Sequence, residues 1–392
     1  MNYLRRVLCA GIIALSVGVQ AQDAITVTVK NTLDFERNEV IAVPVKSLKT
    51  FLRGKKEKDI RIKNSTTGKQ EPFQWIDYDG DKKNDEVLLL AKVPPHGFTK
   101  YVFVVDAALP VAESELTTYS RFVPERTDDY AWENDRVAFR VYGPDAQKRF
   151  EEKRENGTLG SGIDLWLKRT DQPIINSWYK GYISDPMYYH TDRGEGYDPY
   201  HVGASRGTGG TGVWDNEKLL VSKNFVSYKT IATGPLRTIF ELTYAPYSDF
   251  NIKETKRISL DLATNFSKIE VSYNAEKPLP NYTVGITLHK NEGTTFIKQE
   301  EGVFAHEEKI DGAFLGEALL MDPDIVQKAF AHKSKEADQS NLLVVTKPAK
   351  KLTYYAGFAW EKSGQVKDAA DWEGQLKKQA EIIANPLQVS VK

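Results

Sequence analysis

From Ile25 onward, apolar and polar residues alternate with a period of two, which is the pattern of β-strands and not of helices. The alternating runs are rich in β-branched and aromatic residues and are bounded by Asn, Asp, Gly and Pro, which form turns. Such runs cover, among others, residues 25–30, 101–105, 137–142, 239–244 and 268–273. Two segments are expected to be helical: residues 324–332, and residues 371–383 with Trp372, Leu376, Ala380 and Ile383 on one face. The sequence therefore predicts an all-β protein with a few short helices.

The first 21 residues have the pattern of a signal peptide. Arg5 and Arg6 precede an apolar run, residues 7–19, that is too short to span a bilayer, and Val19-Gln20-Ala21 supplies the small residues of a cleavage site. The only cysteine, Cys9, lies within this segment, so the mature chain has no thiol chemistry. We therefore expect an exported protein, located in a bacterial periplasm or outside the cell.

The strand pattern lapses between Ala107 and Thr117, which predicts a domain boundary. Residues 22–112 are expected to form a small region resembling a β-sandwich, and residues 113–392 a larger β-domain. No segment after the signal peptide is apolar for long enough to cross a membrane.

Charge says little about partners, because 53 Lys+Arg stand against 54 Asp+Glu, a net charge of −1. Without a basic stripe to displace counterions from phosphates, we expect no nucleic-acid partner. The 7 Trp, 19 Tyr and 17 Phe are more informative, since rings with a polar edge suit sugars as well as interfaces. Aromatic residues are also common in strands for packing reasons alone. Nothing in the sequence indicates an obligate protein partner.

An acidic segment places Asp77, Asp79, Asp81 and Asp85 at relative positions 1, 3, 5 and 9, with Gly80 allowing a sharp turn. Alternating carboxylates on a turn supply the oxygen ligands that Ca²⁺ requires, and the spacing resembles calcium loops of β-propeller repeats, apart from Lys82 where those loops have glycine. The alternative is a hairpin turn stabilised by aspartate side chains that remain solvated. We expect any calcium ion here to be structural, and no cofactor to be required for catalysis.

The second segment that breaks the strand pattern, residues 184–216, is expected to be one long ordered loop. A dense polar and aromatic group lies in or just before it: Trp178, Lys180, Tyr188, Tyr189, His190, Asp192, Arg193, Glu195, Asp198, Tyr200, His201, Arg206 and Trp214. Such a group suits proton abstraction next to a carboxylate, which needs a cation to neutralise the carboxylate, a base and an acid. It suits equally a scaffold in which these side chains bind the backbone of the loop.

The remaining histidines, His96, His289, His306 and His332, each stand alone in a strand or turn. A lone histidine is more often a packing or surface residue than a ligand, and no His-x-His or His-x-x-x-His pair indicates zinc. The glycine-rich residues 207–212 and the Ser205 segment match nucleotide-binding and hydrolase motifs formally, but they lack the strand-turn-helix context of both.

Several segments resemble the domain-of-unknown-function 4861 family: residues 132–143, 161–168, 189–203, 234–237, and 355–364 with Trp372. The resemblance covers nearly the whole mature chain, and its most specific part is His190-Thr-Asp-Arg-Gly-Glu-Gly196. It implies an origin in bacterial polysaccharide-utilisation loci and similarity to oligosaccharide dehydratases, which remove water from the terminal uronic acid of ulvan fragments. Gly234-Pro-Leu-Arg237 is similar to the galactose-mutarotase type of β-supersandwich, which is therefore the expected fold.

Two functions follow as expectations. In the first, the protein is an exported dehydratase or lyase-like enzyme acting on a uronate-containing oligosaccharide by β-elimination. His190 is then the base or acid, Tyr189 or Tyr200 its partner, and Arg206 with Lys180 the carboxylate clamp. The residues expected to bind the substrate are Trp178, Tyr188, Asp192, Glu195, His201 and Trp214. In the second, the same aromatic residues stack on sugars in a non-catalytic carbohydrate-binding protein.

Overall fold

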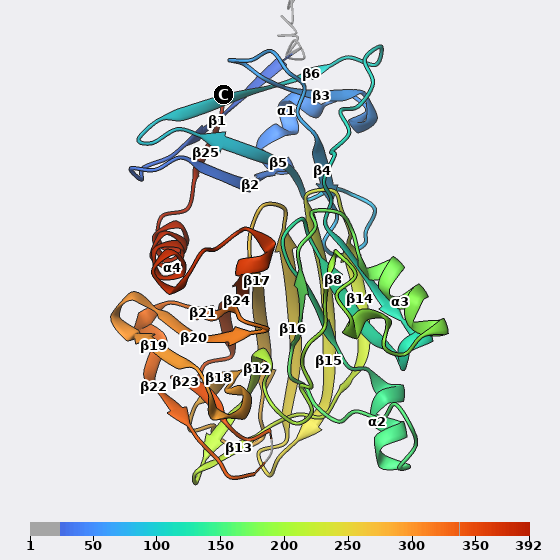
Figure 1. Ribbon diagram of the computed structural model, residues 1–392. Coiled ribbons are helices and arrows are strands. Elements are labelled where there is room, and N and C mark those ends of the chain that lie inside the picture. The colour runs from blue at the N-terminus through green and yellow to red at the C-terminus, as the bar shows by residue number, and fades with distance from the viewer. Residues whose placement is uncertain (1–23, 337) are drawn as a thin grey trace, which may run out of the picture.

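The protein is built mainly of antiparallel β-sheets, and its helices are few and short (Figure 1). The computed structural model describes residues 24–336 and 338–392. The signal peptide expected over residues 1–21 lies outside these residues. The prediction of an all-β supersandwich with few helices is confirmed. No helix in the described part of the chain has the length and apolar character needed to cross a membrane.

The smaller unit is an N-terminal sandwich of two sheets, at the top of Figure 1. One sheet has the order β25 (Gln388–Val391), β1 (Ala24–Lys30), β6 (Phe98–Val105) and β3 (Ile60–Asn64). The other has the order β2 (Arg37–Pro44), β5 (Glu86–Val93) and β4 (Phe73–Ile76). Because side chains alternate between the faces of a strand, Val27, Val43, Leu89 and Phe103 point inward and are fully buried in one core.

The C-terminal strand corrects the predicted domain division. β25 pairs with β1, with Val391 opposite Val27, and Val389 and Val391 pack against the core of the sandwich. The last strand therefore belongs to the N-terminal sandwich and not to the domain predicted for residues 113–392. Alternation in so short a segment predicts a strand, but it does not indicate with which sheet that strand pairs.

The larger unit is built around an eight-stranded sheet. Its order is β14 (Phe225–Ala232), β15 (Arg237–Tyr247), β16 (Ile252–Asp261), β17 (Phe266–Asn274), β24 (Lys351–Trp360), β21 (Ala313–Leu320), β20 (Val303–Ile310) and β19 (Thr294–Lys298). Two five-stranded sheets share its core. One runs β11 (Gly196–Tyr197), β10 (Asp164–Lys168), β9 (Ala138–Val141), β8 (Asp129–Glu133) and β7 (Tyr119–Val123). The other runs β13 (Lys218–Leu220), β12 (Thr208–Asp215), β18 (Tyr282–Thr287), β23 (Asn341–Thr346) and β22 (Val326–His332). One apolar cluster joins all three sheets through Leu165, Ile258 and Val284.

Within residues 24–336 and 338–392, four α-helices accompany these sheets: α1 (Lys49–Leu52), α2 (Pro144–Glu151), α3 (Ile175–Ser184) and α4 (Ala369–Ala384). The helix predicted over residues 371–383 is α4. The carboxylate of Asp368 accepts the Asp371 N–H at its N-terminus, and Trp372 and Leu376 are buried beneath it. Helices α1, α2 and α3 were not predicted.

Two local predictions were wrong. Residues 324–332 do not form a helix, because Val326–His332 pairs as β22 with β23, and pairing overrides a weak local preference. The loop predicted for residues 184–216 contains the 3₁₀ turn η4 (Tyr188–His190) and β11, and it ends where β12 begins at Thr208. The glycines of β12 concealed this strand, since glycine is depleted in strands generally.

Candidate functional site

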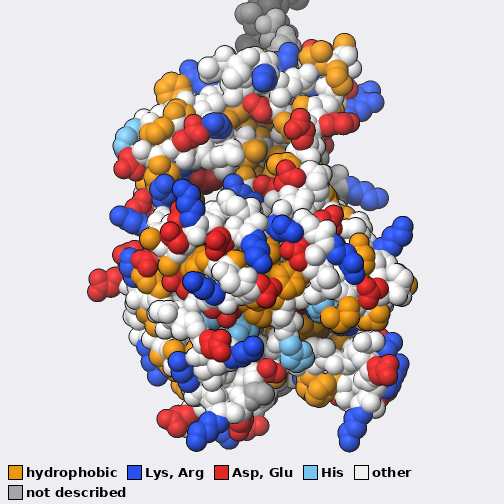
Figure 2. All heavy atoms as spheres, in the orientation of Figure 1, with side chains coloured by type: hydrophobic (Ala, Val, Ile, Leu, Met, Phe, Trp, Pro, Cys, Tyr) orange, Lys and Arg blue, Asp and Glu red, His pale blue; other side chains and the backbone are white. Residues whose placement is uncertain are grey.

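A cleft of about 1060 Å³ opens on the larger unit. It is lined by Met187, His190 and residues 197–201, 287–292, 308–311, 334–336, 338 and 340. Figure 2 shows histidine side chains at the surface in the middle of this unit, below the N-terminal sandwich. His190, His201 and His289 all line the cleft. Half of the six histidines of the chain therefore meet at one hollow.

A second hollow, of about 730 Å³, lies between the N-terminal sandwich and the larger unit, and none of the described histidines lines it. Its arginines are paired with acids already: Arg257 lies 2.7 Å from Glu241, and Arg237 donates to Asp261 at 2.7 Å. We therefore place the candidate site in the cleft lined by histidines.

His190 is the last residue of η4, and a hydrogen bond fixes which of its two ring nitrogens is the basic one. Its Nδ1 lies 2.9 Å from the backbone carbonyl oxygen of Asp198, which can only accept, so Nδ1 carries the proton and Nε2 the lone pair. Burial lowers the pKa of His190 below its ordinary value of 6.5, although the hydrogen bond to Asp198 opposes this shift. The side chain is 30% exposed. His190 is therefore a neutral imidazole at pH 7, held in one tautomer at the edge of the cleft.

Behind His190 lies a buried cluster of charges around Arg140. The guanidinium contacts three aspartates: Asp164 at 2.6 Å, Asp198 at 2.7 Å and Asp129 at 3.7 Å. Burial raises the pKa of Asp198 well above its ordinary value, and the nearby Asp164 adds to the shift. Because Asp198 belongs to this cluster and its backbone holds Nδ1 of His190, the cluster fixes the orientation of the imidazole.

Another part of the cleft wall is formed by Tyr200, His289 and Glu308. The rings of Tyr200 and His289 are stacked, with centroids 3.8 Å apart and planes 7° from parallel. The Tyr200 hydroxyl donates to Glu308 Oε1 at 2.5 Å, and His289 Nδ1 lies 2.7 Å from the same oxygen. Burial would raise the pKa of Glu308, but the hydrogen bonds from His289 and Tyr200 outweigh it and hold the pKa below its ordinary value.

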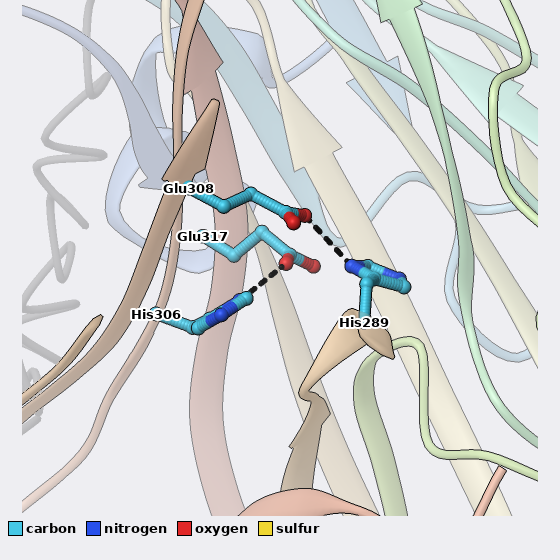
Figure 3. Close-up of side chains that lie close together, drawn as sticks. All are labelled: His289, His306, Glu308 and Glu317. Atoms are coloured by element: carbon cyan, nitrogen blue, oxygen red, sulfur yellow. Dashed lines mark hydrogen bonds and ion pairs between the residues drawn. The ribbon is translucent and has the colours of Figure 1, made fainter. Parts of the chain in front are cut away.

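His306 and Glu317 continue this wall into the interior (Figure 3). They face each other on β20 and β21, with His306 Nδ1 3.4 Å from Glu317 Oε2. His306 Nε2 lies 3.1 Å from the backbone oxygen of Glu292, and Thr208 donates to Glu317 Oε1 at 2.5 Å. Burial opposes a charge on His306, but its contacts with Glu317 outweigh burial and raise the pKa of His306.

The predicted convergence of His190, Tyr189 and Arg206 is wrong. Tyr189 is buried, stacks on Trp166, and its hydroxyl accepts hydrogen bonds from Arg126 and Arg140. Arg206 is buried elsewhere, where it donates to Ser161 Oγ and to the backbone oxygens of Thr211 and Ala204. A buried guanidinium must satisfy its donors, and here the backbone around it does so.

Lys180 is exposed on α3 and does not line the cleft, so the predicted carboxylate clamp of Arg206 and Lys180 does not form. Of the predicted catalytic residues, His190 and Tyr200 are the two that line it. The lysines that line the cleft are instead Lys290, Lys309 and Lys335. All three are exposed and form no ion pair within the described chain.

Of the residues predicted to bind substrate, His201 alone lines the cleft as the structure describes it. The others hold the fold together. Trp178 is buried and donates to Glu195 at 3.0 Å, while Asp192 accepts from the amides of Gly194 and Gly196. Tyr188 lies under the Arg193 guanidinium, and Trp214 on β12 packs edge-on against Phe330 and His332. For these five residues the scaffold interpretation describes the contacts better.

The acidic turn brings together Asp77, Asp79 and Asp81, whose carboxylates offer oxygens within 4.8 Å of one another. Asp85 is not part of this group, and its carboxylate accepts the Tyr78 N–H at 2.8 Å. Asp77 accepts from the amides of Gly80 and Lys82, as expected for a turn stabilised by aspartate. The predicted set of four calcium ligands is thus reduced to three, all on an exposed turn.

His289, His306, Glu308 and Glu317 were missed by sequence reasoning, although part of the signal was present. His306 and Glu308 are two residues apart in a strand and therefore share a face. Asp311-Gly312 is a two-residue turn with φ of 48° and 77°, and it joins β20 to β21 with Ile310 opposite Ala313. Four residues further from the turn on each strand, this register places His306 opposite Glu317. Only the position of His289 required the tertiary structure.

The fold and the site together define an all-β protein with a histidine-lined cleft. The chain belongs to the family described as Domain of unknown function (DUF4861), whose family model matches residues 29–389. It is 40% identical over 372 residues to Uncharacterized protein P7 of Formosa agariphila, an alignment that covers 93% of each chain.

Two solved structures from Enterococcus faecalis are similar in fold: a protein in the Glycosyl Hydrolase Family 38 and an alpha-mannosidase. Each aligns with a TM-score of 0.49 over 95% of this chain, at 9% and 10% sequence identity. The alignments cover 48% and 46% of those proteins, so this chain spans about half their length.

Proposed function

We propose that the protein is a carbohydrate-active lyase that eliminates water from a uronic-acid residue of an oligosaccharide bound in the cleft. The observation that carries the proposal is the state of His190: a neutral imidazole with Nδ1–H on a backbone carbonyl and Nε2 as its basic nitrogen, at the edge of the cleft. A histidine with a pKa near or below the working pH is suited to act as a general base.

The reaction balances with His190 as the only proton carrier. Nε2 takes the C5 proton, which is acidic because it lies next to the carboxylate. The C4–O bond then breaks, the C4=C5 bond forms, and the resulting imidazolium gives its proton to the departing hydroxyl on the same face of the sugar. The products are water and an unsaturated uronate, and His190 returns to its neutral form.

The walls of the cleft supply the other requirements. Removal of the C5 proton puts negative charge on the carboxylate side of the sugar, and cations that meet this charge lower the barrier. Lys290, Lys309 and Lys335 are free to do so because they form no ion pair within the described chain. Tyr200, whose hydroxyl is fixed on Glu308, is assigned to orientation of the sugar hydroxyls.

The contacts of the aromatic residues favour this activity over the alternative of a non-catalytic binding protein. Sugar binding by stacking needs open ring faces. Trp178 and Tyr189 are buried, and the ring of Tyr200 is covered by His289.

The test is incubation with a saturated uronate oligosaccharide, following the absorbance of the conjugated product and the loss of the mass of one water molecule. We expect turnover by the native protein and a rate reduced about 10²–10⁴-fold in His190→Asn, because a general base contributes about that factor. Asparagine can still donate to the Asp198 carbonyl, which helps the variant to keep its fold. The activity of the native protein should fall on acidification with an apparent pKa below 6.5, since the base must be neutral.

His96→Asn is the matched control. His96 Nδ1 lies 3.0 Å from the backbone oxygen of Thr32, the same kind of contact, on the N-terminal sandwich. Its rate should be unchanged. A folded His190→Asn protein with native turnover would contradict the assignment, and no turnover by the native protein on any saturated uronate oligosaccharide would contradict the function.

A further inference from the structure

Four side chains, two on the wall of the cleft and two buried behind it, have the composition and spacing of a metal site. His289, His306, Glu308 and Glu317 point toward one another, and each offers a ligand atom within 4.8 Å of the other three (Figure 3). Ligand atoms about 2.1 Å from an ion lie about 3.4 Å apart when tetrahedral and about 4.2 Å apart when opposite each other. Small movements of the side chains would therefore close these four around one ion.

Three of the four side chains are hydrogen-bonded to partners outside the set, as metal ligands usually are. Glu292 O accepts from Nε2–H of His306, which leaves Nδ1 directed toward Glu317. Thr208 donates to one oxygen of Glu317, and Tyr200 donates to Glu308. His289 is in turn fixed by its stacking on Tyr200. These contacts orient the ligands without using all of their lone pairs.

The charges of the cluster also fit a cation. Glu308 and Glu317 form ion pairs with the two histidines, and with no lysine or arginine in the described chain. Glu317 is buried and Glu308 is only 10% exposed, and carboxylates withdrawn from water need compensating positive charge. One divalent ion supplies two such charges.

We propose that His289, His306, Glu308 and Glu317 bind one divalent transition-metal ion, with Zn²⁺ and Mn²⁺ as the best matches. Two imidazoles select against the purely oxygen-seeking Ca²⁺ and Mg²⁺, and two carboxylates are accepted by zinc and manganese. The ion reaches the site from the cleft, since His289 and Glu308 are 16% and 10% exposed, while His306 and Glu317 are fully buried. The proposal is independent of the elimination assigned to His190.

The experiment uses the full mature protein after dialysis against a chelator. Zn²⁺ and Mn²⁺ are titrated separately by calorimetry, and bound metal is counted by elemental analysis. We expect one ion per chain and a melting temperature that rises on binding, because an ion bound only to the folded state stabilises it. Thr208→Val, which removes a partner of Glu317, should weaken binding about 10–100-fold, as loss of an outer hydrogen bond typically does. Glu308→Gln and Glu317→Gln, which remove a ligand, should weaken it further.

Glu307→Gln is the matched control. Glu307 lies between His306 and Glu308 on β20 and faces the other side of the sheet, so this variant should bind like the native protein. Asp79→Asn controls for ions held by the acidic turn. The metal-free variants are first compared with the native protein by circular dichroism and thermal unfolding. Equal binding by native protein and by a folded Glu308→Gln variant would overturn the proposal, as would absence of binding by the native protein.

Discussion

Two acidic clusters flank the segment that carries His190, and they differ in what neutralises them. Asp198 faces the cluster around Arg140, where an arginine contacts three aspartates in the interior. Tyr200, two residues further on, faces Glu308 and the neighbouring Glu317, whose ion-pair partners are histidines. A single short segment therefore joins a cluster compensated by a permanent cation to one compensated by groups that can lose their charge.

The difference separates scaffold from site. Arginine stays charged at every working pH, so the Arg140 cluster cannot exchange its cation and serves to hold the chain in place. Histidine is neutral or charged near pH 7, so the second cluster can give up protons and accept a cation or a proton from the cleft. Removing the cation from the first cluster should damage the fold, and changing the second should alter binding.

The largest effect is expected from Arg140→Met. Methionine keeps much of the volume but leaves three buried aspartates without their cation, and breaking such a pair costs about 3–5 kcal/mol of the free energy of unfolding. Urea denaturation measures this loss. The exposed pair of Arg193 and Asp185, about 46% and 45% exposed at 3.0 Å, is the control: Arg193→Met should cost less than about 1 kcal/mol. Similar losses in both variants would remove the distinction between buried and surface charge.

The next largest effect is a pH dependence of the free energy of unfolding that arises from Asp129. Burial raises its pKa from 3.8 to about 6, in spite of the opposing charges of Arg140 and Arg126. The folded state therefore holds this proton more tightly than the unfolded state, and the stability that results is present below pH 4 and lost as the pH rises through about 6. We expect the free energy of unfolding to fall by about 1–3 kcal/mol over this window, relative to Asp129→Asn, which cannot ionise. Parallel pH profiles for the two proteins would show that Asp129 is ionised throughout.

The smallest effect on stability is expected from the third acidic group, which consists of Asp77, Asp79 and Asp81. This group lies on an exposed turn, and its carboxylates accept hydrogen bonds from backbone amides of the same turn. Water already solvates these carboxylates, so Asp79→Asn should change the free energy of unfolding by less than about 1 kcal/mol without calcium. If the predicted calcium ion binds, calcium raises the melting temperature of the native protein but not of this variant. A native melting temperature that chelator leaves unchanged would identify an ordinary turn.

Local chemistry explains which predictions succeeded. Strands were found because alternation is a property of neighbouring residues, and α4 because its apolar face and its Asp368 cap lie within one segment. His190 and Tyr200 belong to one dense polar segment and line the cleft, while their catalytic roles stay predictions. Arg206 and Tyr189 belong to the same segment, yet they turn inward, and the sequence contains no sign of this difference.

The sequence by itself determined the fold class, the α4 helix and the segment that bears the candidate base. It also contained, in the Asp311-Gly312 turn, a signal for the pairing of His306 with Glu317 that the prediction did not use. Only the tertiary structure decided that His289 meets this pair, that Arg140 gathers three aspartates and that β25 returns to the N-terminal sandwich. The reason is physical. Side-chain alternation and turn geometry act over a few neighbouring residues. These contacts instead join segments that are far apart in the chain, and such contacts produce no repeating pattern in the sequence. They form because burial in a shared core brings distant strands together, and the charges then pair with whatever that packing places beside them.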